Sequence, residues 1–166
     1  MKGAYHTVRG YQLLEQNKKH ITSSMEDYLE MIYRGSREDG YLRIGQLADL
    51  LNVRAPSASR MVQRLSELGL LRFKKYGIIM LNEDGEVIGE YLLERHRRLE
   101  KFLKILGCEN EIIQQTELME HCIDRELFLY IEIMCNFLMD HQDILKQYFD
   151  YKVKYRQQQK DSQELY

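Results

Sequence analysis

The chain has 166 residues, of which 44% are apolar and 30% are charged, and its net charge is −2. This balance predicts a folded protein with a hydrophobic core and excludes disordered, collagen-like and proline-rich architectures. The longest apolar stretch, Leu127 to Met139, is broken by Glu132 and Asn136, so the sequence predicts no membrane span. An N-terminus without a continuous apolar segment, together with three cysteines, an odd number, indicates a cytoplasmic protein without a disulfide framework.

In the first half of the chain, the pattern predicts short helices followed by a hairpin. Residues 1–21 show no clear period and form an extension whose structure the pattern leaves open. A capping box from Ser23 to Glu26 precedes a helix over about 24–37. Three further elements follow: a short helix over 44–51, a helix beginning at Ala55-Pro56-Ser57, and a hairpin of 70–75 and 78–81 around Tyr76-Gly77.

The second half predicts a series of helices. Asn82 can cap a long helix from about residue 83 to 106, which Gly107 ends, and a helix from 109 or 110 to Cys122 follows. Cys122 is expected to lie in the core, and the polar tail from Tyr151 is either helical or disordered.

The helix expected after Asp124 is apolar on nearly all sides. One stripe comprises Leu127, Phe128, Ile131, Met134, Cys135 and Leu138, and the opposite side comprises Leu129, Tyr130, Ile133 and Phe137. Such a helix needs burial on both sides. In so short a chain, the expected second partner is another copy of the same protein, which predicts a homodimer.

Charge is distributed unevenly along the chain. Residues 43–76 carry a net charge of +5, whereas residues 109–150 carry a net charge of −8. The basic block suits a polyanion and the acidic block suits cations, although either can be an ordinary solvated surface.

The basic block has the element order of a winged helix-turn-helix, whose second helix enters the major groove of double-stranded DNA. Arginine and glutamine can read base edges there, whereas serine and the wing cations suit phosphate. The predicted DNA-binding residues are Arg54, Pro56, Ser57, Ser59, Arg60, Gln63, Arg64, Arg72, Lys74 and Lys75. A winged helix that binds proteins instead is the alternative.

Residues of metal-ligand type recur on three predicted helices. Asp27 and Glu30 lie three apart on the first, His96 and Glu100 lie four apart on the long one, and the next helix carries Glu117, Glu120 and His121. Each group alone is more often a solvated surface than a metal site, but together they offer oxygen and imidazole ligands.

The order of these motifs resembles the diphtheria toxin repressor family, and within it the manganese transport regulators. The resemblance covers about residues 22–140. It rests on the segments Met25-Glu26-Asp27-Tyr28-Leu29-Glu30, Arg54-Ala55-Pro56-Ser57-Ala58-Ser59, Arg95-His96-Arg97-Arg98-Leu99-Glu100 and Glu117-Leu118-Met119-Glu120-His121.

The resemblance implies a site for two metal ions per subunit, formed by Asp27, Glu30, His96, Glu117, Glu120 and His121. Iron-responsive members of the family have Met at the position of Asp27 and Cys at that of Glu117. The hard oxygens at both positions here favour Mn²⁺, with Fe²⁺, Co²⁺ or Zn²⁺ as alternatives.

The expected protein is mainly α-helical: a winged helix-turn-helix with a hairpin wing at residues 22–82, a helical metal-binding and dimerisation domain at 83–150, and a polar tail at 151–166. Its expected function is metal-dependent regulation of transcription, as a repressor of metal-uptake genes, without a small organic substrate. The alternatives are a winged-helix regulator that metal does not control and a di-metal carboxylate enzyme. The enzyme is disfavoured because no His has Glu three residues before it.

Overall fold

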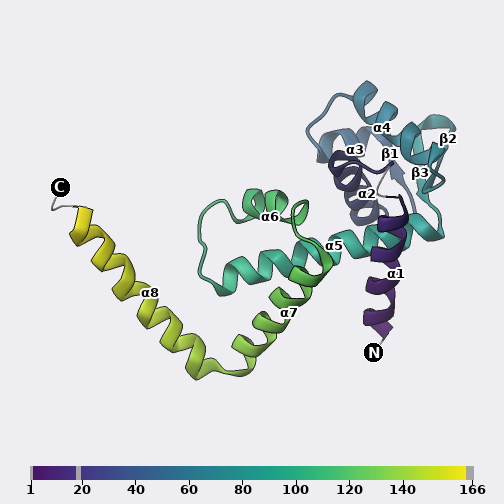
Figure 1. Ribbon diagram of the computed structural model, residues 1–166. Coiled ribbons are helices and arrows are strands. Elements are labelled where there is room, and N and C mark those ends of the chain that lie inside the picture. The colour runs from purple at the N-terminus through teal and green to yellow at the C-terminus, as the bar shows by residue number, and fades with distance from the viewer. Residues whose placement is uncertain (1, 18–19, 164–166) are drawn as a thin grey trace. The chain divides into compact units, whose positions relative to one another are not determined.

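In a computed structural model, residues 2–17 and 20–163 are described, and they form a mainly helical protein with one small sheet (Figure 1). The chain divides into two compact units, Met1–His96 and Arg97–Tyr166. The division falls inside the continuous helix α5 (Glu83–Ile105). The domain boundary expected at residue 82 stays a prediction, although it coincides with the start of α5.

The first unit contains a helical bundle and an antiparallel sheet. Its elements before α5 are α1 (Lys2–Asn17), α2 (Ser23–Ser36), β1 (Leu42–Arg43), α3 (Ile44–Leu50), α4 (Ala55–Glu67), β2 (Leu71–Lys74), the 3-10 turn η1 (Lys75–Gly77) and β3 (Ile78–Leu81). The N-terminal extension, for which the pattern gave no structure, thus contains a 16-residue helix.

The sheet has the order β1-β3-β2, with the predicted hairpin formed by β2 and β3 and a third strand that the pattern did not reveal. Only two residues long, β1 is too short to show an alternating pattern. The core of this unit includes Leu29 and Ile32 of α2, Leu47 of α3 and Ile79 of β3, all fully buried.

The capping box predicted at the start of α2 is wrong. The N-cap of α2 is Thr22, whose side chain makes no capping hydrogen bond. The Glu26 carboxylate instead accepts a hydrogen bond from Arg95 Nη2 at 2.7 Å. A hydrogen bond between two charged groups is stronger than the bond from a neutral backbone N–H in a capping box. The Glu26 carboxylate therefore binds the Arg95 guanidinium instead of capping α2.

The second unit consists of the end of α5, α6 (Ile112–Glu120), α7 (Arg125–Asp140) and α8 (Gln142–Gln163). Gly107, at φ +70°, follows α5, and the Asp124 side chain caps α7 by accepting from Leu127 N at 2.8 Å. Both boundaries were predicted. The tail is helical as far as Gln163.

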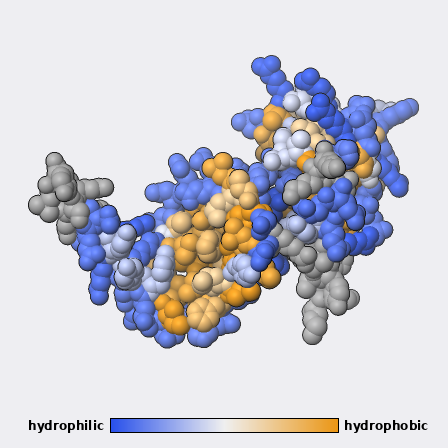
Figure 2. Space-filling view, in the orientation of Figure 1, coloured by the Kyte–Doolittle hydropathy of each residue, from blue (hydrophilic) through white to orange (hydrophobic). Residues whose placement is uncertain are grey.

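One face of α7 is buried and the other is exposed. Phe128, Ile131, Cys135 and Leu138 pack in a core with Leu99 of α5. The exposed face consists of Leu127, Leu129, Tyr130, Ile133, Met134 and Phe137, which are 43% to 55% exposed. Figure 2 shows apolar surface over α7. Leu127 and Met134, predicted on the inward stripe, therefore lie on the outer face, because they flank the four buried positions.

Cys122 is exposed, so its predicted place in the core is wrong. It lies in the turn after α6, where Cys122 N bonds to Met119 O at 3.0 Å. A turn residue has no helix face that packing could bury. None of the helices among the described residues is long and apolar enough to cross a membrane.

Candidate DNA interface and metal-binding residues

Helix α4 has one buried and one exposed face. Ala58, Val62 and Leu65 are fully buried, which turns the polar side of the helix outward. Pro56 lies in the first turn, where its missing N–H costs no helical hydrogen bond. The predicted contact residues on and before α4 are exposed, except for half-buried Ser59: Arg54, Pro56, Ser57, Arg60, Gln63 and Arg64.

The wing presents the remaining predicted cations. Along β2, buried Leu71 alternates with exposed Arg72, and half-buried Phe73 alternates with exposed Lys74. Lys75 is also exposed, in the turn η1 that joins β2 to β3. The two-residue period of a strand exposes Arg72 and Lys74, and with Lys75 of the turn the hairpin presents three exposed cations.

Two predicted metal ligands meet within the first unit. The Glu30 carboxylate of α2 and a ring nitrogen of His96 of α5 lie within 4.8 Å of each other. Glu30 is buried, and Arg34 Nη1 donates to it at 3.4 Å. Asp27 is exposed and lies three residues before Glu30, hence on the same side of α2. We name Asp27, Glu30 and His96 the first ligand group.

The second unit carries the other predicted ligands. Glu117 and Glu120 belong to α6, and His121 is its C-cap. His121 Nε2 lies 3.9 Å from Glu120 Oε1. Glu117 is exposed, three residues before buried Glu120. We name Glu117, Glu120 and His121 the second ligand group.

The donor atoms of both groups fit a divalent cation. Each group pairs carboxylate oxygens with an imidazole nitrogen, and neither contains sulfur. In both groups a carboxylate oxygen and a ring nitrogen are separated by no more than 4.8 Å. Carboxylate and imidazole are the ligands that manganese and its first-row neighbours bind.

A buried ion pair, which the sequence pattern did not predict, lies beside the first ligand group. The Arg95 and Glu26 side chains are 7% and 16% exposed and lie 2.7 Å apart. The two residues directly precede His96 and Asp27. No local pattern could reveal the pair because its members are 69 positions apart.

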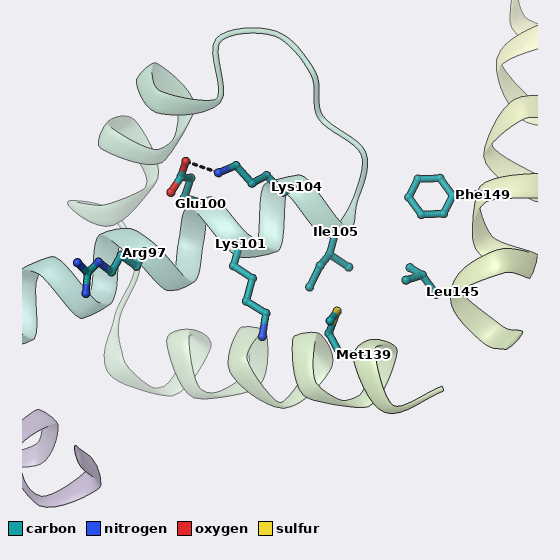
Figure 3. Close-up of a pocket in the computed structure, with 8 residues that line it drawn as sticks. All are labelled: Arg97, Glu100, Lys101, Lys104, Ile105, Met139, Leu145 and Phe149. Carbon is teal, nitrogen blue, oxygen red and sulfur yellow. Dashed lines mark hydrogen bonds and ion pairs between the residues drawn. The ribbon is translucent and has the colours of Figure 1, made fainter. Parts of the chain in front are cut away.

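The second unit also contains an open cavity of about 490 Å³. Figure 3 shows the apolar side chains of Ile105, Met139, Leu145 and Phe149 at one end of it. Arg97, Lys101 and Lys104 of α5 add positive charge, and Lys104 Nζ lies 2.5 Å from the Glu100 carboxylate. Glu100, which lies four residues after His96, therefore forms an ion pair with Lys104 of the same helix.

These features define a class of protein: a winged-helix DNA-binding unit joined to a helical unit, with candidate metal ligands on both. The comparisons with known proteins agree. Residues 20–79 match the iron dependent repressor N-terminal DNA binding domain, and residues 82–156 match the iron dependent repressor metal binding and dimerisation domain. The chain belongs to the iron dependent repressor family.

Among curated relatives, the HTH-type transcriptional regulator MntR of Listeria monocytogenes serotype 4a (strain HCC23) is 38% identical over 126 residues, which are 75% of this chain and 89% of the relative. MntR of Lysinibacillus sphaericus (strain C3-41) is 35% identical over 126 residues, 75% of this chain and 91% of the relative.

Two solved structures share the fold. The manganese regulator SloR is 30% identical with a TM-score of 0.60, over 68% of this chain and 54% of that one. A manganese-dependent transcriptional repressor in complex with manganese is 28% identical with a TM-score of 0.61, over 68% of this chain and 53% of that one. The chain spans about half the length of these two structures.

The family membership confirms the expected fold and the resemblance. The chain is a metal-dependent transcriptional repressor with a DNA-binding domain and a metal-binding and dimerisation domain, and not an enzyme. The family thereby excludes the di-metal carboxylate enzyme and supports the regulator that metal controls.

Proposed function

We propose that the protein represses metal-uptake genes in the cytoplasm in response to Mn²⁺, as a homodimer bound to operator DNA. The observation that carries this proposal is the approach of Glu30 and His96 to within 4.8 Å inside one unit of a family member. The titles of the two similar structures, a manganese regulator and a manganese-dependent repressor, support the choice of metal.

We propose that each subunit binds two ions and that the residues of the first and second ligand groups supply the ligands. The ions supply positive charge to carboxylates that repel each other within each group, Asp27 with Glu30 and Glu117 with Glu120. Hard oxygen donors at Asp27 and Glu117 favour Mn²⁺ over softer ions. The intrinsic affinity order nevertheless places Mn²⁺ below Fe²⁺, Co²⁺ and Zn²⁺, so those metals are the alternatives to test.

The DNA contact is assigned to α4 and the wing. Arg60, Gln63 and Arg64 can read base edges in the major groove, whereas Arg72, Lys74 and Lys75 suit the phosphate backbone. Arg54, Pro56, Ser57 and Ser59 belong to the start of α4, where a helix N-terminus suits a phosphate oxygen.

The homodimer contact is assigned to the exposed apolar face of α7. Exposed apolar residues that gather on one face of a helix mark an interaction site. A dimer presents two recognition helices to half-sites about one DNA turn, ~10 bp, or a multiple of it apart.

Metal binding is expected to act on DNA binding through α2. This helix carries Asp27 and Glu30 and is followed directly by the β1-α3-α4 segment that contains the recognition helix. Ordering α2 therefore orders the reading unit. A coupling free energy of about 1–3 kcal/mol corresponds to a 5- to 150-fold change in operator affinity.

The test is a fluorescence titration of the purified chain with labelled DNA from the upstream region of a metal-uptake gene. The titration is made in chelator and then with Mn²⁺, Fe²⁺, Co²⁺ or Zn²⁺ at fixed ionic strength. We expect Mn²⁺ to raise the affinity at least about 5-fold. Equal affinity in chelator and in all four metals refutes metal control, and a response to Zn²⁺ alone refutes the manganese assignment.

A further inference from the structure

Helix α1 precedes the part of the chain that the family's domains cover, since the first match begins at residue 20. It is nevertheless part of the core of the first unit. Leu14 is 6% exposed and belongs to the same buried cluster as Tyr28 and Leu29 of α2, with Tyr11 packed against that cluster. This additional helix is therefore integrated with the DNA-binding domain.

Three contacts join α1 to one stripe of α5. Arg9 Nη2 bonds to Glu83 Oε1 at 3.0 Å in the first turn of α5. One and two turns further along, Gly10 approaches the helix so closely that a Cβ atom on it would lie 2.8 Å from Val87 O and 2.4 Å from Tyr91 Cβ. Only glycine permits this approach. Residues 83, 87 and 91 are four apart and share one face of α5.

The next position on this stripe of α5, after residues 83, 87 and 91, is Arg95, which lies beside the first ligand group. Arg95 follows Tyr91 by one turn, and its guanidinium lies 5.9 Å from the centre of the Tyr91 ring. This guanidinium forms the buried ion pair with Glu26 of α2. Arg95 directly precedes His96, and Glu26 lies one turn before Glu30. The ion pair therefore ties α2 to α5 beside the place where Glu30 meets His96.

The position of α5 on α2 decides whether those two ligands meet. If α5 shifts along α2 or turns about its own axis, Glu26 and Arg95 separate and buried charges lose their partners. The contact of Gly10 with Tyr91 opposes such a shift from the side of α1, because the backbone of α1 lies directly against α5 there.

We propose that α1 is a positioning element for metal binding, which holds α5 in register with α2 through Tyr91 and the Arg95–Glu26 ion pair. This inference rests on the proposed metal site. By keeping Glu30 and His96 together in the metal-free chain, α1 raises the population of the binding-competent arrangement. The apparent dissociation constant rises in inverse proportion when that population falls.

The experiment compares two glycines that both lie in helices. Gly10→Ala places a methyl group against Tyr91, whereas Gly45→Ala in α3 places one where no atom beyond the adjoining residues and helix backbone lies within 4 Å. Mn²⁺ affinity of the full chain is measured by competition with a fluorescent chelator, without DNA, at a temperature at which circular dichroism shows both variants folded. We expect Gly10→Ala to weaken Mn²⁺ binding about 3- to 30-fold and Gly45→Ala to leave it unchanged.

A double-mutant cycle separates positioning from general destabilisation. If α1 acts through the ion pair, Gly10→Ala and Arg95→Gln together weaken Mn²⁺ binding by less than the product of their separate effects. Effects that multiply overturn the proposed route. If Gly10→Ala does not fold, Tyr11→Ala replaces it, because this change removes a ring contact to Tyr91 without adding a clash.

The outcomes distinguish this inference from the proposed function. A wild-type chain that binds Mn²⁺ while Gly10→Ala binds it equally well overturns the role of α1 and leaves the metal site standing. A wild-type chain that does not bind Mn²⁺ overturns both.

Discussion

At the scale of the residue, position in the fold separates side chains of the same type into different tasks. Glu26, Asp27 and Glu30 lie within five residues of one another on α2. Glu26 is paired with Arg95, Glu30 meets His96, and Asp27 is exposed one turn from Glu30. The task of each carboxylate follows from the partner that the fold brings to it, because all three have the same chemistry.

Glu120→Gln is expected to weaken Mn²⁺ binding at least about 10-fold, since it replaces a charged oxygen ligand by a neutral amide of the same shape. Calorimetric titration with Mn²⁺ measures the loss, and circular dichroism checks that the helices persist. The matched control is Glu109→Gln, at an exposed position outside both ligand groups. Equal Mn²⁺ affinity of the two variants contradicts the assignment of Glu120.

Arg60→Ala is expected to cost about 1–3 kcal/mol of operator binding, because the exposed guanidinium in the second turn of α4 can bond two acceptors on a guanine edge. Fluorescence anisotropy in Mn²⁺ measures the affinity, and Mn²⁺ binding itself should not change. Arg37→Ala, which removes an exposed cation after α2, is the charge control. A loss of the same size in both variants points to nonspecific attraction.

Tyr91 makes stability depend on pH at the alkaline end. Burial raises the pKa of Tyr91 above its ordinary value of 10.0, and the Arg95 guanidinium offsets part of that rise. The folded chain therefore holds this proton more tightly than the unfolded chain. The resulting stabilisation is fully present below the ordinary pKa and is lost as pH rises through the folded one.

We therefore expect wild-type stability to fall more steeply than that of Tyr91→Phe between about pH 9 and pH 11. Urea unfolding at fixed ionic strength measures both profiles. Parallel profiles would show that another group is responsible for the alkaline loss.

At the scale of the element, the ends of α5 show how polar side chains fix a helix. At its start, Asn82 Oδ1 accepts from Gly85 N at 2.9 Å, which supplies the predicted cap. At its end, Lys152 Nζ of α8 donates to the carbonyl oxygens of Leu106 and Gly107 at 2.7 Å and 2.6 Å. A cation at this end also suits the helix dipole. The tail is thereby attached to the end of α5.

Lys152→Met keeps the length of the side chain and removes the ammonium group. We expect a loss of about 1–3 kcal/mol, since carbonyl oxygens that are partly buried lose a charged donor. The melting temperature should fall by several degrees, and hydrogen exchange should increase in α8. Lys154→Met, two residues further along at an exposed position, is the control and should melt like the wild type.

At the scale of the whole molecule, the exposed apolar face of α7 would remain in contact with water if the protein were a monomer. This helix buries four apolar residues in its own unit and exposes seven more, the six of this face and Met139. Leaving so much apolar surface in water is costly at about 25 cal/mol per Å², and covering it in a dimer recovers that free energy. The same reasoning predicted a dimer from the sequence pattern alone.

Ile133→Glu is expected to raise the dimer dissociation constant at least about 30-fold, because it would bury an unpaired charge in the proposed interface. Sedimentation velocity over a concentration series measures the shift. Leu50→Glu, at a leucine of α3 that is 54% exposed like Ile133, is the matched control and should leave the dimer intact. A variant at Ile133 that dimerises like the wild type moves the interface away from α7.

Most of the helices, the hairpin and the order of the candidate ligands could be predicted without the structure. The helices are predicted by their hydrophobic period, and their ends are marked by Asn82, Gly107 and Asp124. These signals are local, because each acts within a few residues of its own position. The candidate oxygen and imidazole ligands could be proposed for a related reason: their order along the chain can be compared with a family.

Tertiary contacts decided the rest. Segments far apart in the chain decide the partner of Glu26, the outward turn of Leu127 and Met134, the pairing of β1 with β3 and the docking of α1. Sequence pattern reports which side chains prefer burial or a charged partner. It does not say which distant group satisfies that preference, because the free energy of such contacts arises only when the chain has folded.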